Sequence, residues 1–104
     1  MAQGISWSRE ALDDIDQIAE FISRDSLQHA RRVATALFEL GDTIAMFPSA
    51  GRIVPELQDD TVRERFLYSY RIVYQTHADQ VAILAVLHGR RLLESLGERF
   101  DIHE

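Results

Sequence analysis

The chain has 104 residues, a formal net charge of −6, no cysteine and an apolar content of 46%. This length predicts one domain, 1–104, with a single hydrophobic core over about 5–96, and the apolar content excludes a disordered chain. The lack of cysteine excludes disulfide frameworks and cysteine metal sites, and no apolar run approaches the roughly 20 residues that span a bilayer.

The charge is unevenly distributed along the chain. Residues 1–50 carry a net charge of −4, residues 51–91 carry +1 and residues 92–104 carry −3. A protein that binds nucleic acid in bulk usually has a basic excess, which this chain lacks. The N-terminus has no signal-peptide pattern and the histidines lack metal-ligand spacing, so we expect a cytoplasmic protein without membrane contact, metal or cofactor.

The first half of the chain predicts a short strand followed by two helices. Ile5-Ser6-Trp7 has the alternation of a strand, and Ser8 is a suitable N-cap for a helix over about Arg9–Arg24 whose outer face is acidic. Asp25 or Ser26 opens a second helix, which Pro48 ends. Two long helices joined by so short a connection form an antiparallel hairpin.

Gly41 falls on the apolar stripe of the second helix, where glycine costs about 1 kcal/mol relative to alanine. Close approach of another part of the backbone would explain it, and chance drift would explain it equally well.

The second half of the chain predicts a sheet. A short strand at Arg52–Val54 precedes three segments rich in β-branched and aromatic residues, which are Arg63–Tyr68, Tyr70–Tyr74 and Val81–Leu87. The last of these is apolar at seven consecutive positions, as expected of a strand covered on both faces. A short helix ending near Gly97 follows. The element order predicts an α+β fold with a helical hairpin packed on a small, mainly antiparallel sheet.

Four residue strings, in this order, resemble the RelE/ParE superfamily of type II toxin–antitoxin toxins, which includes plasmid stabilisation proteins. They are Trp7 before the first helix, Phe47-Pro48 with Gly51-Arg52, Tyr70-Arg71-Ile72-Val73-Tyr74, and Val86-Leu87-His88-Gly89-Arg90-Arg91. The resemblance extends from about Ile5 to Leu93, and the last two strings are most similar to the ParE branch. It implies a bacterial growth inhibitor held in a hetero-oligomer by a cognate, ParD-like antitoxin.

The branches of this superfamily imply different targets. RelE-like members cleave mRNA on the ribosome with a C-terminal tyrosine, whereas ParE-like members inhibit DNA gyrase without that catalytic set. No tyrosine follows His88-Gly89-Arg90-Arg91, and the next aromatic residue is Phe100. The resemblance therefore favours gyrase as the target, with a ribosome-dependent endoribonuclease and a non-toxic, complex-forming member as alternatives.

A ribonuclease without a metal would need an acid, a base and cations around the phosphate. His88 would be the acid or base, and Arg65, Arg71 and Arg90 would bind the phosphate. Glu64 is another possible base, but the two-residue period of a strand places it on the face opposite Arg63 and Arg65. A histidine hydrogen-bonded at a strand end, with arginines paired to acids, is the structural explanation of the same residues.

Two surfaces are predicted to bind partners. The target surface consists of Arg63, Arg65, Arg71, His88, Arg90 and Arg91. An apolar groove beside Leu27, Val33 and Leu37 would receive a helix of the antitoxin. The acidic first helix would complement a basic stretch of the same antitoxin.

Overall fold

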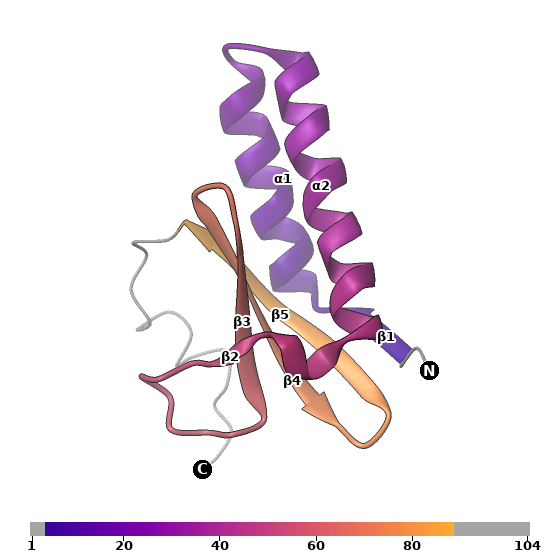
Figure 1. Ribbon diagram of the computed structural model, residues 1–104. Helices are drawn as coiled ribbons and strands as arrows, with labels where there is room; N and C mark the ends of the chain where they lie inside the picture. The colour runs from indigo at the N-terminus through magenta and orange to yellow at the C-terminus, as the bar shows by residue number, and fades with distance from the viewer. Residues whose placement is uncertain (1–3, 89–104) are drawn as a thin grey trace.

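A computed structural model describes residues 4–88 as a helical hairpin packed on one face of a five-stranded sheet (Figure 1). In chain order the elements are β1 (Gly4–Trp7), α1 (Arg9–Ser23), α2 (Leu27–Met46), a 3-10 turn η1 (Pro48–Ala50), β2 (Arg52–Ile53), β3 (Val62–Leu67), β4 (Tyr70–His77) and β5 (Gln80–His88). The strands lie in the order β1-β5-β4-β3-β2. β1 pairs with β5 in parallel, and the other pairs are antiparallel. The predicted α+β fold is confirmed, while the predicted C-terminal helix lies outside the described residues.

Serine caps set the N-termini of both helices. The Ser8 hydroxyl accepts a hydrogen bond from the Ala11 backbone N–H at 3.0 Å, so the predicted cap of α1 is confirmed. Ser26, the second of the two proposed residues, caps α2 by accepting a bond from the His29 N–H at 3.1 Å. Each cap satisfies a backbone donor that has no partner inside its helix.

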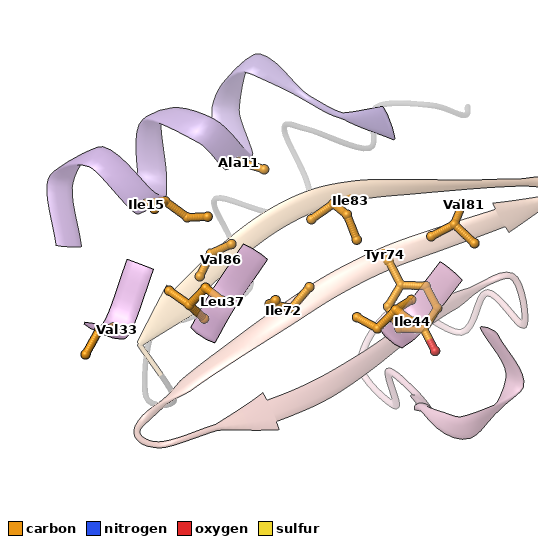
Figure 2. Packing of buried hydrophobic residues seen from close by; sticks show 10 residues of the cluster. All are labelled: Ala11, Ile15, Val33, Leu37, Ile44, Ile72, Tyr74, Val81, Ile83 and Val86. Atoms are coloured by element: carbon orange, nitrogen blue, oxygen red, sulfur yellow. The ribbon is translucent and has the colours of Figure 1, made fainter. Parts of the chain in front are cut away.

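The main core lies between the helical hairpin and the sheet. Figure 2 shows apolar side chains from α1, α2, β4 and β5 pointing toward one another. Its ten members are Ala11, Ile15, Val33, Leu37, Ile44, Ile72, Tyr74, Val81, Ile83 and Val86, all of them buried. The helix residues recur at spacings of four and seven, which is why both helices present one apolar stripe to the sheet.

Gly41 allows Trp7 to pack against α2. A Cβ atom at Gly41 would overlap the Trp7 ring, whose centroid lies 4.9 Å from that of Phe38. Of the two explanations left open by the sequence, close approach is therefore the correct one, but the neighbour is an indole ring and not another part of the backbone.

A smaller core covers the other face of the sheet. It consists of Val54, Val62, Val73, Ala85 and Leu87, with Leu57 and Leu84 packed beside it. An irregularity in the β4–β5 register at Val73/Tyr74 accompanies the consecutive burial of Ala85, Val86 and Leu87. The prediction that this segment is covered on both faces is confirmed.

Both sheet hairpins turn on two residues, and the first residue of each turn has a positive φ. Tyr68 between β3 and β4 has φ 56°, and Ala78 between β4 and β5 has φ 54°. A positive φ matches the two-residue turns that join right-twisted strands, but it is sterically costly for any residue with a Cβ. Within residues 4–88, no helix has the length and hydropathy that crossing a bilayer requires.

Candidate functional site

The register of the sheet divides the candidate residues between its two faces. Arg63 pairs with Tyr74 and Arg65 with Ile72, so both arginines lie on the face that carries the helices. Glu64 and Arg71 lie on the opposite face, because their cross-strand partners are Val73 and Phe66. Directly opposed residues share a face, and the prediction that Glu64 points away from Arg63 and Arg65 is confirmed.

Glu64 is a buried carboxylate between two arginines. Its residue exposure is 1%, and one carboxylate oxygen accepts a hydrogen bond from Arg71 at 2.8 Å while the other accepts one from Arg52 Nε at 2.6 Å. The Arg71 side chain is only 7% exposed, whereas that of Arg52 is 63% exposed and lies over the Phe66 ring, 5.8 Å from its centroid. Arg71 is therefore part of a structural ion pair.

Arg52 was not among the sequence candidates. It reaches Glu64 because β2 pairs with β3 so that Arg52 lies directly opposite Glu64. Two signals in the sequence pointed to Arg52, the short strand that it begins and its place in the Gly51-Arg52 string. Neither reveals the register, which is not readable from so short a segment.

Arg63 binds the turn after α2 on the helix-bearing face. Its guanidinium donates to the Gly51 carbonyl at 2.6 Å and to the Ser49 carbonyl at 3.4 Å. The Tyr74 hydroxyl donates to the Pro48 carbonyl at 2.6 Å and accepts from the Gly51 N–H at 3.1 Å. Desolvation by burial raises the pKa of Tyr74 above its ordinary value of 10.0, with smaller opposing contributions from the Gly51 hydrogen bond and from nearby arginines.

His88 lies at the exposed end of β5 on the same face as Arg65. It is opposite Tyr70 in the β4–β5 pair, and the two rings meet edge to face with centroids 5.7 Å apart. Arg65 is one strand further away and beside Ile72, and it is half-buried. Arg90 and Arg91, the other members of the predicted target surface, lie outside the described residues.

The predicted antitoxin groove needs a correction. Val33 is 2% exposed and Leu37 is 0% exposed, because both belong to the core between α2 and the sheet. Leu27 is 56% exposed at the start of α2, and it borders a shallow groove between the two helices whose floor includes Ala19, Ala30 and Ala34. Of the three predicted residues, only Leu27 is available to a partner in this fold.

The described residues offer no metal centre. Within residues 4–88, no three side chains of histidine, aspartate or glutamate gather closely enough to hold an ion. In the described part of the sheet, Arg63 binds backbone carbonyls on one face, and Arg52 and Arg71 bind a carboxylate on the other.

The sequence and fold are similar to those of known toxins. Residues 5–93 match the family model described as the ParE toxin of the type II toxin-antitoxin system parDE. No curated protein sequence matches significantly. Among solved structures, the chromosomal ParDE TA system from P. aeruginosa has a TM-score of 0.70 and 17% identity, over 84% of this chain and 96% of that chain. The RelBE2 toxin-antitoxin complex from Mycobacterium tuberculosis has a TM-score of 0.65 and 16% identity, over 85% and 99%.

Proposed function

Because the chain belongs to the ParE toxin family of type II toxin–antitoxin systems, we propose that it is a toxin that inhibits DNA gyrase by binding it. A cognate antitoxin neutralises it by covering part of its surface. The mechanism is a protein–protein interaction that stops the gyrase cycle after the DNA strands have been cleaved, and no bond is broken by the toxin itself.

The observation that supports this proposal is that the candidate ribonuclease residues lie on two different faces of the sheet. Metal-independent RNA cleavage needs its acid, base and cations around one phosphate. Arg65 and His88 lie on the helix-bearing face, while Arg71 is buried on the opposite face with its guanidinium on Glu64. Within residues 4–88, the candidate set therefore does not converge on one point, which supports binding over catalysis.

Ribosome-dependent mRNA cleavage is the second candidate, and His88 is the observation that favours it. This histidine is exposed and lies edge-on to Tyr70, so the two side chains form a histidine–tyrosine pair at the end of β5. Such a pair is capable of proton transfer if mRNA reaches it.

The deciding experiment measures DNA supercoiling by purified gyrase and mRNA cleavage on translating ribosomes, each with the purified chain. We expect gyrase inhibition with accumulation of cleaved DNA, and intact mRNA. His88→Ala should leave a chain that still inhibits gyrase, because no catalytic step depends on this side chain. Normal supercoiling with codon-phased mRNA cleavage that His88→Ala abolishes would reverse the proposal. Neither effect, in a chain that still binds its antitoxin, would indicate a non-toxic member.

We place the antitoxin contact at the tip of the helical hairpin. Phe21 and Leu27 are 68% and 56% exposed there, and the groove beside Leu27 is lined by small side chains that would admit an apolar helix. The outer face of α1, with Asp13, Asp16 and Glu20 exposed, would complement a basic segment of the antitoxin. Leu27→Asp should weaken antitoxin binding, whereas Ile53→Asp, at a 39% exposed position of β2 away from both helices, should not. Equal binding by both variants would contradict this placement.

A further inference from the structure

A second, polar groove runs along the outer side of α2 beside the β3–β4 turn. It has a volume of about 510 Å³ and is lined by Gln28, Arg31, Arg32, Thr35, Ala36, Glu39 and Tyr68, so all but one of its side chains carry a polar group. This volume is large enough to hold several side chains of a partner. Arg31 also borders the apolar groove at the hairpin tip, so Arg32 and Tyr68 are the residues that distinguish the polar groove.

The two arginines of this groove are available to an external acid. Both are exposed on α2, and neither side chain forms an ion pair or hydrogen bond with another residue in the part of the chain that the structure describes. By contrast, three arginines of the sheet bind a carboxylate or backbone carbonyls, namely Arg52, Arg63 and Arg71. Arginine with open donors is suited to bidentate binding of a carboxylate or phosphate.

Tyr68 is exposed although its backbone conformation is costly. Its φ of 56° is one that glycine adopts without strain, yet the position carries a large aromatic side chain that is 64% exposed. Residues held in sparsely populated backbone regions often have a functional role. Because the side chain forms a wall of the groove, that role would be contact with whatever occupies it.

The composition of the groove fits a transient protein partner. Arginine and tyrosine are the residue types enriched among interface hot spots, and polar contacts dominate short-lived complexes, whereas permanent partners bury apolar surface. Glu39 lies two helical turns from Arg32, about 10 Å along the axis, so the groove is positive at one end and negative at the other. Together with the net charge of −6, this acid disfavours a nucleic-acid backbone.

We infer that this polar groove binds the target protein through a segment that presents a carboxylate to Arg31 and Arg32, a cation to Glu39 and apolar surface to Tyr68. The antitoxin contact at the hairpin tip adjoins this groove at Arg31, whereas Arg32 and Tyr68 line the polar groove alone. The inference rests on the proposed function, because the target that it specifies is gyrase.

The test compares two groove variants with two matched controls. Tyr68→Gly removes the side chain while relaxing the turn, and Ala78→Gly makes the same backbone change in the other hairpin. Arg32→Glu reverses a groove charge, and Arg9→Glu reverses an exposed charge at the start of α1 that lines neither groove. Loss of a hot spot predicts a fall in gyrase-inhibiting potency of roughly thirtyfold for each groove variant, with the controls within about twofold of the parent chain. Antitoxin binding should be unchanged in all four.

Four results of this experiment would contradict the inference or the proposed function. Parent-like potency in both groove variants would overturn the inference, and so would loss of antitoxin binding alone, which would assign the groove to the antitoxin. Binding of free DNA that Arg32→Glu abolishes would assign the groove to nucleic acid. If the parent chain does not inhibit gyrase, the proposed function fails, and growth inhibition by the same variants tests the groove. Equal toxicity of groove and control variants, or no toxicity in the parent chain, would then overturn it.

Discussion

At the scale of single residues, three arginines of the sheet, Arg52, Arg63 and Arg71, are held in place by two different kinds of acceptor. Glu64 accepts hydrogen bonds from Arg52 and Arg71 on one face. Backbone carbonyls of the turn after α2 accept from Arg63 on the other. A buried carboxylate is tolerated only when cations and hydrogen bonds compensate it, so Glu64, Arg52 and Arg71 depend on one another.

Removal of the Glu64 carboxylate should be strongly destabilising. Glu64→Ala leaves Arg71 without this partner in a site where its side chain is 7% exposed, and we expect the free energy of unfolding to fall by about 3–5 kcal/mol. Glu56→Ala, at an exposed position, should change it by less than about 0.5 kcal/mol. Urea denaturation checks both values, and a loss below about 1 kcal/mol for Glu64→Ala would show that the ion pair contributes little.

Tyr74 should make the fold sensitive to alkali. Burial raises its pKa in the folded state, so above the ordinary value of 10.0 the unfolded chain releases the phenol proton more readily than the folded chain. Unfolding then releases protons, and stability falls as the pH rises from about 10 through the folded pKa. Below that window the hydroxyl is protonated in both states and the contribution of Tyr74 is constant.

Tyr74→Phe tests this account. It removes the bonds to Pro48 and Gly51, and we expect a loss of about 1–3 kcal/mol at neutral pH. Above about pH 10 the variant should lose less stability than the parent chain, because it has no phenol to titrate. Tyr68→Phe, which alters an exposed side chain, serves as the control. Denaturation at a series of pH values provides the measurement, and an unaltered alkaline slope in Tyr74→Phe would refute the assignment.

At the scale of elements, β1 and α2 are joined by the contact between Trp7 and Gly41. Glycine lowers the intrinsic stability of a helix, and the sequence retains it where the indole ring occupies the space of a Cβ atom. The ring also packs against Phe38, so Trp7 has little freedom to move away. The edge strand β1 and the helix therefore depend on each other for their positions.

Gly41→Ala should destabilise the protein although alanine is the better helix former. The gain of about 1 kcal/mol in helix propensity is smaller than the overpacking cost, and we expect a net loss of about 1–2 kcal/mol. In a Trp7→Leu background the same substitution should be neutral or stabilising, because the ring is absent. A double-mutant cycle by chemical denaturation measures this coupling, and additive effects of the two changes would contradict it.

At the scale of the whole molecule, one sheet carries two cores. The larger core lies under the helices, and the smaller one, around Val73 and Leu87, covers the other face. β4 and β5 contribute to both, since neighbouring residues of a strand point to opposite faces. A substitution that destabilises one core should therefore also destabilise the other, because the two cores share these strands.

Leu87→Ala tests this cooperativity, because Leu87 has no place in the core under the helices. We expect the free energy of unfolding to fall by about 2–5 kcal/mol, with the helical circular dichroism and the Trp7 fluorescence changing in a single transition. Leu27→Ala, at a 56% exposed position, should cost less than about 1 kcal/mol. Separate transitions for the two signals would show that the layers unfold independently.

The sequence by itself determined the elements, their order and the α+β class. It also predicted the cap at Ser8 and the placement of Glu64 on the sheet face that does not carry Arg63 and Arg65. These features follow from local rules, because helical spacing, the two-residue period of strands and capping chemistry all act within a few residues. The family resemblance, carried by four short strings in order, was likewise contained in the sequence, and the match over residues 5–93 confirms it.

Only the tertiary structure decided which residues meet. Strand register decides the parallel pairing of β1 with β5 and the partnership of Glu64 with Arg52. The angle at which the hairpin meets the sheet decides that Val33 and Leu37 are buried while Leu27 is exposed. Both are set by contacts between residues far apart in the chain, and a one-residue shift in register would exchange the two faces of a strand. The site residues were therefore less predictable than the fold that positions them.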